Sequence, residues 1–243
     1  MKLTTVLSSV NNNPNYYKFI PKQILFWNYF NIKFIAVFVG EKIPEELENY
    51  KENIILWSRN LDLNTAYVGQ NLRIFYTALI DLPEDEMIMI TDMDMLPTND
   101  TYYKKNLENY NKDDFINYNY NGGDQIFMCY NAGHPIIWGR IFNITSENDI
   151  EKELYKNYNK EYDGIPGGKG WCTDQYIMYT YIIRYPYVKF LNRPVKKLEI
   201  SMYLDHLKNN DKNFIKRYDD VHFHRNYENN LKLILDAENQ LQF

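Results

Sequence analysis

The chain has 243 residues, of which 45% are hydrophobic and 16% aromatic, and this content indicates a folded globular protein rather than a disordered chain. The net charge of -5 argues against a nucleic-acid partner, because contact along a phosphate backbone requires a basic face. The sequence contains no apolar run long enough to cross a bilayer, no signal-peptide pattern and too few cysteines for a disulfide framework. We therefore expect a cytoplasmic protein with reduced thiols and no transmembrane segment.

The first hundred residues alternate between strand and helix patterns. Apolar, β-branched runs predict strands over residues 3–10, 32–39, 53–57 and 87–90. Apolar residues at helical spacing predict a helix around Ile20 to Trp27 and another from Thr65 to Leu79, and the charged segment Lys42–Lys51 is a surface helix or loop. The order βαββαβ predicts an α/β fold with a mostly parallel central sheet flanked by helices.

The second half has weaker patterns. Residues 100–121 are polar and irregular or helical, Gln125–Tyr130 is a predicted strand, and Asn131 to Pro135 breaks it. Further helices are predicted over 136–142, 176–183 and 228–241, with a strand over 188–191 and an extended segment over 218–225, and residues 147–162 form an amphipathic charged stretch. Because the chain has no repeat or linker, we expect a single domain.

An acid pair follows the fourth predicted strand. The apolar run Met87–Ile90 ends abruptly in Thr91, Asp92, Met93 and Asp94. In extended backbone, residues two apart point the same way, so both carboxylates should project from the carboxyl edge of the sheet, where open α/β folds bind ligands. Two close carboxylates repel each other unless a cation lies between them, and Mg²⁺ or Mn²⁺ prefers such oxygen ligands. The pattern favours a divalent-metal site over the alternative, a solvated acidic turn.

Two late histidines are candidates for a third metal ligand. Alternation along the extended segment 218–225 places His222 and His224 on one face. An imidazole suits Mn²⁺ better than Mg²⁺, although a surface or core position is the alternative for either histidine alone. Arg225, Lys216 and Arg217 are candidates for phosphate contacts or an ordinary solvated face.

A glycine-rich segment precedes another candidate. Residues 163–170 contain four glycines and one proline and predict a loop, either a mobile lid or a plain surface connection. Asp174 lies between this loop and an apolar helix, where a carboxylate caps a helix or acts as a general base. Trp171 offers an apolar ring face beside it. His134 is a weaker candidate.

Taken in order, these motifs resemble the GT-A-fold glycosyltransferases. The resemblance rests on the Asp92-x-Asp94 pair, the strand-turn Asn131-Ala-Gly133, the loop with Trp171-x-x-Asp174-Gln, and His222, and it covers roughly residues 3–225. The Asn-Ala-Gly and Asp-Gln elements are similar to the glycogenin-like group, without its C-terminal HxxGxxKPW signature. Small glycosyltransferases of large DNA viruses are similar in size and composition. The resemblance implies one domain over residues 1–243, with a nucleotide-binding half over about 1–97 and an acceptor-binding half over about 98–243.

The resemblance also implies a role for each matching residue. It makes Asp92, Asp94 and His222 the ligands of Mn²⁺ or Mg²⁺ at the donor diphosphate, with His224 in reserve. The residues expected at the nucleotide are Ser8, Ser9, Arg73, Asp92 and Met93. Asp174 is the expected catalytic residue, and the residues expected at the transferred sugar or acceptor are Asn131, Gly133, Gly170, Trp171 and Asp174.

The implied function is metal-dependent transfer of a sugar from a nucleoside-diphosphate sugar, with a UDP-sugar favoured, to a hydroxyl of a glycan or protein-linked acceptor. Asp174 is the general base in an inverting enzyme and stabilises the oxocarbenium-like sugar in a retaining one. The alternatives are a nucleotidyltransferase that forms sugar nucleotides and a non-catalytic carbohydrate-binding relative. A nucleotidyltransferase normally carries a Gly-rich, basic signature after its first strand, where this chain has Ser-Ser-Val-Asn-Asn. A non-catalytic relative would tolerate loss of the two acids, which are present in this chain.

Overall fold

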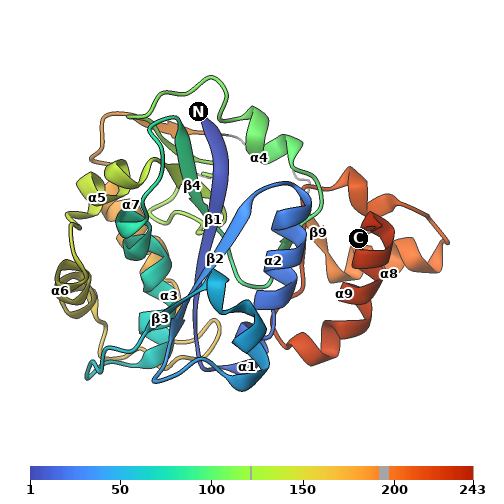
Figure 1. Cartoon of the computed structure of the whole chain (residues 1–243), viewed down its shortest axis with the longest axis horizontal. Helices are drawn as coiled ribbons and strands as arrows, with labels where there is room; N and C mark the ends of the chain where they lie inside the picture. The colour runs from blue at the N-terminus through green and yellow to red at the C-terminus, as the bar shows by residue number, and fades with distance from the viewer. Residues whose placement is uncertain (121, 192–196, 243) are drawn as a thin grey trace.

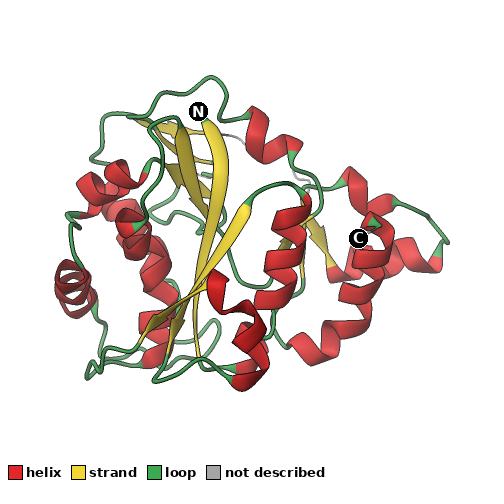
Figure 2. Ribbon diagram, viewed as in Figure 1, coloured by secondary structure: helices red, strands yellow, loops and turns green. Residues whose placement is uncertain are grey.

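The computed structural model describes residues 1–120, 122–191 and 197–242, and its main feature is a seven-stranded sheet (Figures 1 and 2). The strand order is β3-β2-β1-β4-β7-β6-β8. Its strands are β1 (Lys2–Asn11), β2 (Lys33–Val39), β3 (Ile54–Trp57), β4 (Glu86–Ile90), β6 (Phe115–Asn117), β7 (Asn131–Gly133) and β8 (Val188–Phe190). All neighbours pair in parallel except β7, which is antiparallel to β4 and β6. The predicted α/β fold with a mostly parallel central sheet is confirmed.

Helices cover both faces of this sheet (Figure 1). One face carries α1 (Pro14–Tyr17) and α2 (Ile20–Tyr29); the other carries α3 (Thr65–Tyr76), α5 (Pro135–Phe142), α6 (Glu147–Asn157) and α7 (Thr173–Ile182). Two buried hydrophobic clusters correspond to these faces, and β1 contributes Val6 and Val10 to one and Leu7 to the other. This alternation is the two-residue period of a strand that is buried on both sides.

A smaller sheet lies beside the main one and was not anticipated from the sequence. It has the order β5-β10-β9, formed by β5 (Met95–Pro97), β10 (Asp220–His222) and β9 (Lys197–Glu199). The central strand β10 is antiparallel to β5 and parallel to β9. Helices α8 (Ile200–Lys208) and α9 (Tyr227–Leu241) complete this end of the molecule, drawn in orange and red in Figure 1. The remaining short elements are η1 (Glu45–Asn53), η2 (Thr77–Leu79), α4 (Thr101–Lys105) and η3 (Phe214–Arg217).

Most predicted elements are confirmed, but the strand predicted over Gln125–Tyr130 is wrong, and the extended segment predicted over 218–225 ends before His224 and Arg225, whose φ angles are +48° and +62°. The strand at this point is instead Asn131–Gly133, which the sequence had indicated as a break. The side-chain amide of Asn131 explains the difference, because Nδ2 donates to the carbonyls of Phe127 and Met128 at 2.9 and 3.1 Å. These bonds hold the preceding segment in an irregular path. Residues 100–121 also contain a strand, β6, besides helix α4, and Asn121 lies outside the described residues.

Across the described residues, no helix combines the length and the hydrophobicity that crossing a membrane requires.

Candidate functional site

The acid pair lies in a turn that follows β4, at the carboxyl edge of the parallel strands. The Met95 N–H donates to the Asp92 carbonyl at 3.3 Å, so the chain turns between the two acids. The expectation that extended backbone aligns the two carboxylates is therefore wrong. Asp94 is buried, whereas the Asp92 side chain is 29% exposed.

Gln23, on the buried face of α2, fixes this turn from the side. Its Nε2 donates to the carbonyls of Asp92, Met93 and Met95 at 3.2, 2.8 and 2.8 Å, and its Oε1 accepts from Trp27 Nε1 at 2.9 Å. Sequence reasoning missed Gln23. The signal was available, because a lone amide shares the predicted apolar face of this helix with Ile20 and Trp27.

The small sheet brings His222 to Asp94. In the antiparallel pair, His222 lies opposite Met95, the residue after Asp94, and His222 Nε2 is 3.4 Å from Asp94 Oδ2. The Arg225 N–H donates to the same oxygen at 2.9 Å. Burial alone would raise the pKa of Asp94, but His222 and the Arg225 N–H outweigh it and lower that pKa. For His222, burial lowers the pKa, and Asp94 outweighs it, so its pKa is raised.

Arg73 links Asp92 to Asp174. From α3, its Nη1 pairs with Asp92 Oδ1 and its Nη2 with Asp174 Oδ2, the latter at 2.8 Å. Burial would lower the pKa of Arg73, but the two carboxylates raise it. Asp174 is 1% exposed, and burial raises its pKa although Arg73 opposes the rise. The N-cap of α7 is Cys172, so Asp174 does not cap that helix.

The predicted nucleotide contacts Ser8, Ser9 and Met93 are engaged within the protein. Ser8 Oγ donates to the Thr91 carbonyl at 2.9 Å, which joins β1 to the segment after β4. Ser9 Oγ donates to the Gly69 carbonyl and accepts from the Arg73 N–H at 2.8 Å, which joins β1 to α3. Met93 is buried in the core cluster beside α2. Contact of these residues with a nucleotide remains a prediction.

The predicted substrate contacts are divided between the sheet and the loop before α7. Asn131 and Gly133 are buried in β7, and Asn131 Oδ1 also accepts from Asn117 Nδ2 at 2.7 Å. Trp171 is partly exposed, and the Arg225 guanidinium lies 5.0 Å from its ring centroid. Gly170 has a φ of +73°, a conformation that glycine adopts readily.

Asp163 holds the glycine-rich loop closed on itself. Its Oδ1 accepts from the Ile165 N–H at 2.9 Å and its Oδ2 from the Lys169 N–H at 3.0 Å. This carboxylate accounts for the compact loop between α6 and α7. Whether the loop acts as a lid remains a prediction.

Tyr16 is a second residue that sequence reasoning missed. Its hydroxyl is buried and lacks a hydrogen-bond partner within the described part of the chain. Burial raises the pKa of Tyr16 to about 12; Asp94 and Asp92 add to the rise, and Arg225 and Arg73 oppose it. The charges of Asp92, Asp94, Arg73 and Arg225 thus act on the Tyr16 hydroxyl. No sequence signal separates it from the 23 tyrosines of the chain.

Two of the three predicted metal ligands meet in this structure. Asp94 and His222 are in contact, while the carboxylate of Asp92 is turned to Arg73. The residue types fit Mn²⁺ or Mg²⁺, because two carboxylates and one imidazole supply oxygen and nitrogen ligands. His222 Nδ1 is buried and has no hydrogen-bond partner among the described residues. His224, the reserve candidate, contacts Glu199 rather than Asp94.

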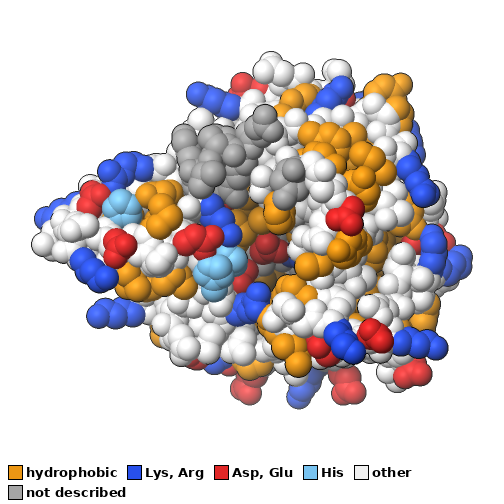
Figure 3. All heavy atoms as spheres, turned by 180° about the vertical axis from the view of Figure 1, so that it is seen from behind, with side chains coloured by type: hydrophobic (Ala, Val, Ile, Leu, Met, Phe, Trp, Pro, Cys, Tyr) orange, Lys and Arg blue, Asp and Glu red, His pale blue; other side chains and the backbone are white. Residues whose placement is uncertain are grey.

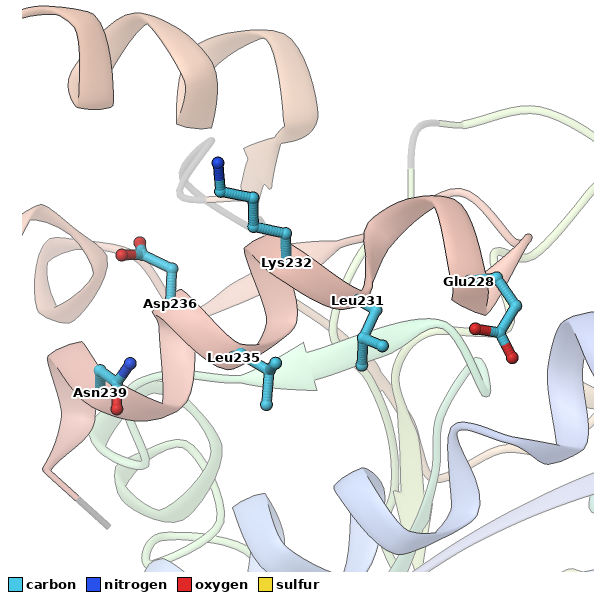
Figure 4. Close-up of a pocket in the computed structure, with 6 residues that line it drawn as sticks. All are labelled: Glu228, Leu231, Lys232, Leu235, Asp236 and Asn239. Carbon is cyan, nitrogen blue, oxygen red and sulfur yellow. The ribbon is translucent and has the colours of Figure 1, made fainter.

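On the face opposite to that of Figure 1, a histidine side chain lies with acidic and basic side chains at the edge of a hollow (Figure 3). A separate surface hollow of about 570 Å³ lies along α9 and is lined by Glu228, Leu231, Lys232, Leu235, Asp236 and Asn239 (Figure 4). None of the predicted site residues lines this second hollow, so it is distinct from the acid pair.

No protein-family model and no curated protein sequence matches the chain. Comparison with solved structures finds glycosyltransferases. The galactosyltransferase LgtC, in complex with donor and acceptor sugar analogues, aligns over 98% of this chain and 95% of its own, with a TM-score of 0.54 and 10% identity. A glycosyltransferase involved in glycosylation of the major capsid of PBCV-1 aligns over 100% and 99%, with a TM-score of 0.50 and 10% identity. The chain thus has the GT-A glycosyltransferase fold, and the resemblance stated from its motifs is confirmed at the level of the fold.

Proposed function

We propose that this protein is a metal-dependent glycosyltransferase that moves a sugar from a nucleoside-diphosphate sugar, with a UDP-sugar favoured, to a hydroxyl of a glycan or protein-linked acceptor. The contact between Asp94 and His222 carries the proposal. It joins the turn after β4 to a strand near the end of the chain, inside a fold that known glycosyltransferases share.

Asp92, Asp94 and His222 are the residues that would hold Mn²⁺ or Mg²⁺. A bound ion would neutralise the negative charge that builds on the leaving diphosphate. Asp94 is already oriented by the Arg225 N–H, and Asp92 is exposed enough to turn from Arg73 toward the others. We expect the donor nucleotide to bind at the carboxyl ends of β1 and β4, near Ser8, Ser9, Arg73 and Met93.

Asp174 is proposed to act at the sugar or the acceptor hydroxyl. Its buried carboxylate has a raised pKa, which suits a group that accepts a proton from a hydroxyl. In an inverting reaction it is the general base; in a retaining reaction it stabilises positive charge on the sugar. Because Asp174 is 1% exposed, a substrate reaches it only after a local movement, for which the loop from Gly164 to Gly170 is the proposed lid.

The direct test is release of free nucleotide from a panel of UDP-, GDP- and TDP-sugars in the presence of Mn²⁺. We expect release with at least one donor, its loss in EDTA and its recovery on adding Mn²⁺. No release with any donor, together with no thermal stabilisation by nucleotide and Mn²⁺, would contradict the proposal.

Two variants separate the proposed roles. Asp92→Asn should abolish Mn²⁺-dependent nucleotide binding, whereas Asp62→Asn, which alters an exposed acid, should bind normally. Asp174→Asn should keep donor binding and lose turnover by at least about a hundredfold. Unchanged turnover in Asp174→Asn would leave this residue only its structural contacts with Arg73 and the Gln175 N–H.

A further inference from the structure

One group of potential metal ligands in the described residues lies next to the acid pair but does not include it. Glu199, His222 and His224 offer ligand atoms that all lie within 4.8 Å of one another. Asp92 and Asp94 do not belong to this group. The group therefore joins the two candidate histidines to Glu199, an acid that the motifs did not indicate.

Sheet register produces this convergence. His222 lies in β10, the middle strand of the small sheet, where it is paired with Glu199 of β9 on one side and with Met95 of β5 on the other. His222 consequently has an acidic neighbour on each side. Its Nε2 is 3.4 Å from Asp94 Oδ2, and its Nδ1 is 3.8 Å from Glu199 Oε2.

His224 completes the group. Its ring centroid is 3.8 Å from that of His222, and its Nε2 contacts Glu199 Oε2, the same oxygen that His222 Nδ1 faces. A tetrahedral ion with ligands at about 2.1 Å holds its donor atoms roughly 3.4 Å apart. The spacing between His222 and Glu199 is close to this value, and the half-exposed His224 side chain has room to move outward.

Two further observations favour a metal at this group. Lys197 Nζ binds the other carboxylate oxygen of Glu199, Oε1, at 2.8 Å, and so orients the carboxylate while leaving Oε2 toward the histidines. Such outer contacts commonly orient the ligands of a metal. His222 Nδ1 is buried without a hydrogen bond to any described residue, so it is an unused donor atom aimed at the group.

We propose that Glu199 Oε2, His222 Nδ1 and His224 Nε2 form a second cation site, which takes a first-row transition ion such as Zn²⁺. Two imidazoles and one carboxylate are ligands of the kind that Zn²⁺ accepts, with a fourth position open. This second site differs from the one proposed at Asp92 and Asp94 in the nitrogen of His222 that it uses. The second site uses Nδ1, whereas Nε2 faces Asp94.

Occupation of the second site excludes His222 from the first. A neutral imidazole has a lone pair on only one of its two nitrogens. When Nδ1 binds Zn²⁺, Nε2 carries the proton and donates toward Asp94 instead of binding an ion there. Zn²⁺ thus antagonises Mn²⁺ at the acid pair; this consequence, unlike the Zn²⁺ site itself, rests on the proposed function.

The test is Zn²⁺ titration of the full-length, metal-free protein by calorimetry, with Co²⁺ absorption as a second readout of imidazole ligation. We expect His224→Asn and Glu199→Gln each to weaken Zn²⁺ binding by at least about tenfold. Asparagine is chosen because His224 has a φ of +48°, which Asn tolerates. Asp94→Asn should retain the Zn²⁺ site, and His206→Gln, a histidine outside the group, should bind as the wild type does.

Antagonism is measured without turnover, by the electron paramagnetic resonance signal of free Mn²⁺. Adding one equivalent of Zn²⁺ should release Mn²⁺ from the wild type, and His224→Asn should require at least about tenfold more Zn²⁺. Absence of Zn²⁺ binding, binding unchanged in both His224→Asn and Glu199→Gln, or binding lost in Asp94→Asn would overturn the site. A protein that binds Zn²⁺ as expected but transfers no sugar would refute only the proposed function.

Discussion

At the scale of single residues, Arg73 has the most connected position in the site. One buried guanidinium pairs with Asp92, a proposed metal ligand, and with Asp174, the proposed catalytic residue. Burial of a charged group is costly unless an opposite charge pairs with it. Both partners of Arg73 are acids that are themselves buried or partly buried. Arg73 therefore sets the resting position of both carboxylates, so movement of Asp92 toward a metal also changes the charge around Asp174.

Arg73→Lys tests this coupling. A lysine keeps the charge but lacks the fork that reaches two carboxylates at once, so one acid loses its partner. We expect a loss of about 1–3 kcal/mol in the free energy of unfolding, measured by urea denaturation. Arg59→Lys is the matched control, because Arg59 also pairs with two acids, Glu147 and Glu151, but at the surface. That variant should lose much less stability than Arg73→Lys, because solvent screens the surface pairs, and equal losses would contradict the buried coupling.

The pair of His222 and Asp94 predicts a pH dependence in the metal-free protein. The raised pKa of His222 means that its stabilising contribution is complete below its unfolded pKa of about 6.5 and is lost as pH rises through the folded value. The lowered pKa of Asp94 means that its contribution is complete above about pH 4 and is lost as pH falls through the folded value. Both contributions are present together between about pH 4 and 6.5.

We therefore expect the melting temperature of the wild type to exceed that of His222→Gln most clearly near about pH 5.5 in EDTA. The difference should shrink as pH rises through the raised pKa of folded His222, above which the imidazole is neutral in both states. Melting curves across this range provide the measurement. A difference that stays constant with pH would show that His222 stabilises the fold by packing alone.

At the scale of elements, the site depends on how closely α3 approaches β1. Gly69 makes this approach possible, because a Cβ at its position would lie 2.8 Å from the Asn11 nitrogen and 3.1 Å from the Val10 carbonyl carbon. Both contacts are with backbone, which cannot rotate away. Ser9 and Arg73 are joined across the same interface, so the approach also positions the guanidinium.

Gly69→Ala tests this interface, because the close approach determines whether the substitution raises or lowers the free energy of unfolding. In a helix that has room, alanine in place of glycine stabilises by about 0.5–1 kcal/mol. Here the clash should reverse the sign and cost about 1–3 kcal/mol in unfolding free energy. The change should also weaken nucleotide binding, since Arg73 moves with α3. A stabilised variant would show that α3 moves away from β1 without a loss of stability.

The elements that could be predicted from the sequence are those that carry their own pattern. β2 and β4 are apolar runs, β1 is a mixture of apolar, β-branched and small residues, and α2 and α3 show helical spacing, so local chemistry determines each of them. The small sheet consists of three-residue strands that are too short to have a period, and Glu199 was missed for that reason. The contact of His222 with Asp94 was foreseen only through the order of motifs, and the pairing of Arg73 with Asp174 was not foreseen.

At the scale of the whole molecule, the site is assembled from both halves of the chain. β1, α3 and the acid turn come from the first hundred residues, while Asp174, His222 and Arg225 come from the second half. Arg225 makes two of the connections between these parts: its N–H binds Asp94, and its guanidinium lies over Trp171 at the end of the glycine-rich loop. An ion or nucleotide that shifts the acid turn should therefore change the solvent exposure of Trp171.

Trp171 provides a direct optical measurement of this connection. The other tryptophans, Trp27, Trp57 and Trp138, are at most 2% exposed, so quenching by acrylamide reports mainly on Trp171. Addition of UDP and Mn²⁺ should reduce the quenching constant of the wild type by about twofold or more as the loop closes over the site. Trp171→Phe should abolish the change, and Asp92→Asn should keep the Trp171 signal but not respond to the ligands. If the quenching constant of the wild type stays the same while nucleotide binding is measured independently, the glycine-rich loop does not close on the donor, and Arg225 anchors only the acid turn.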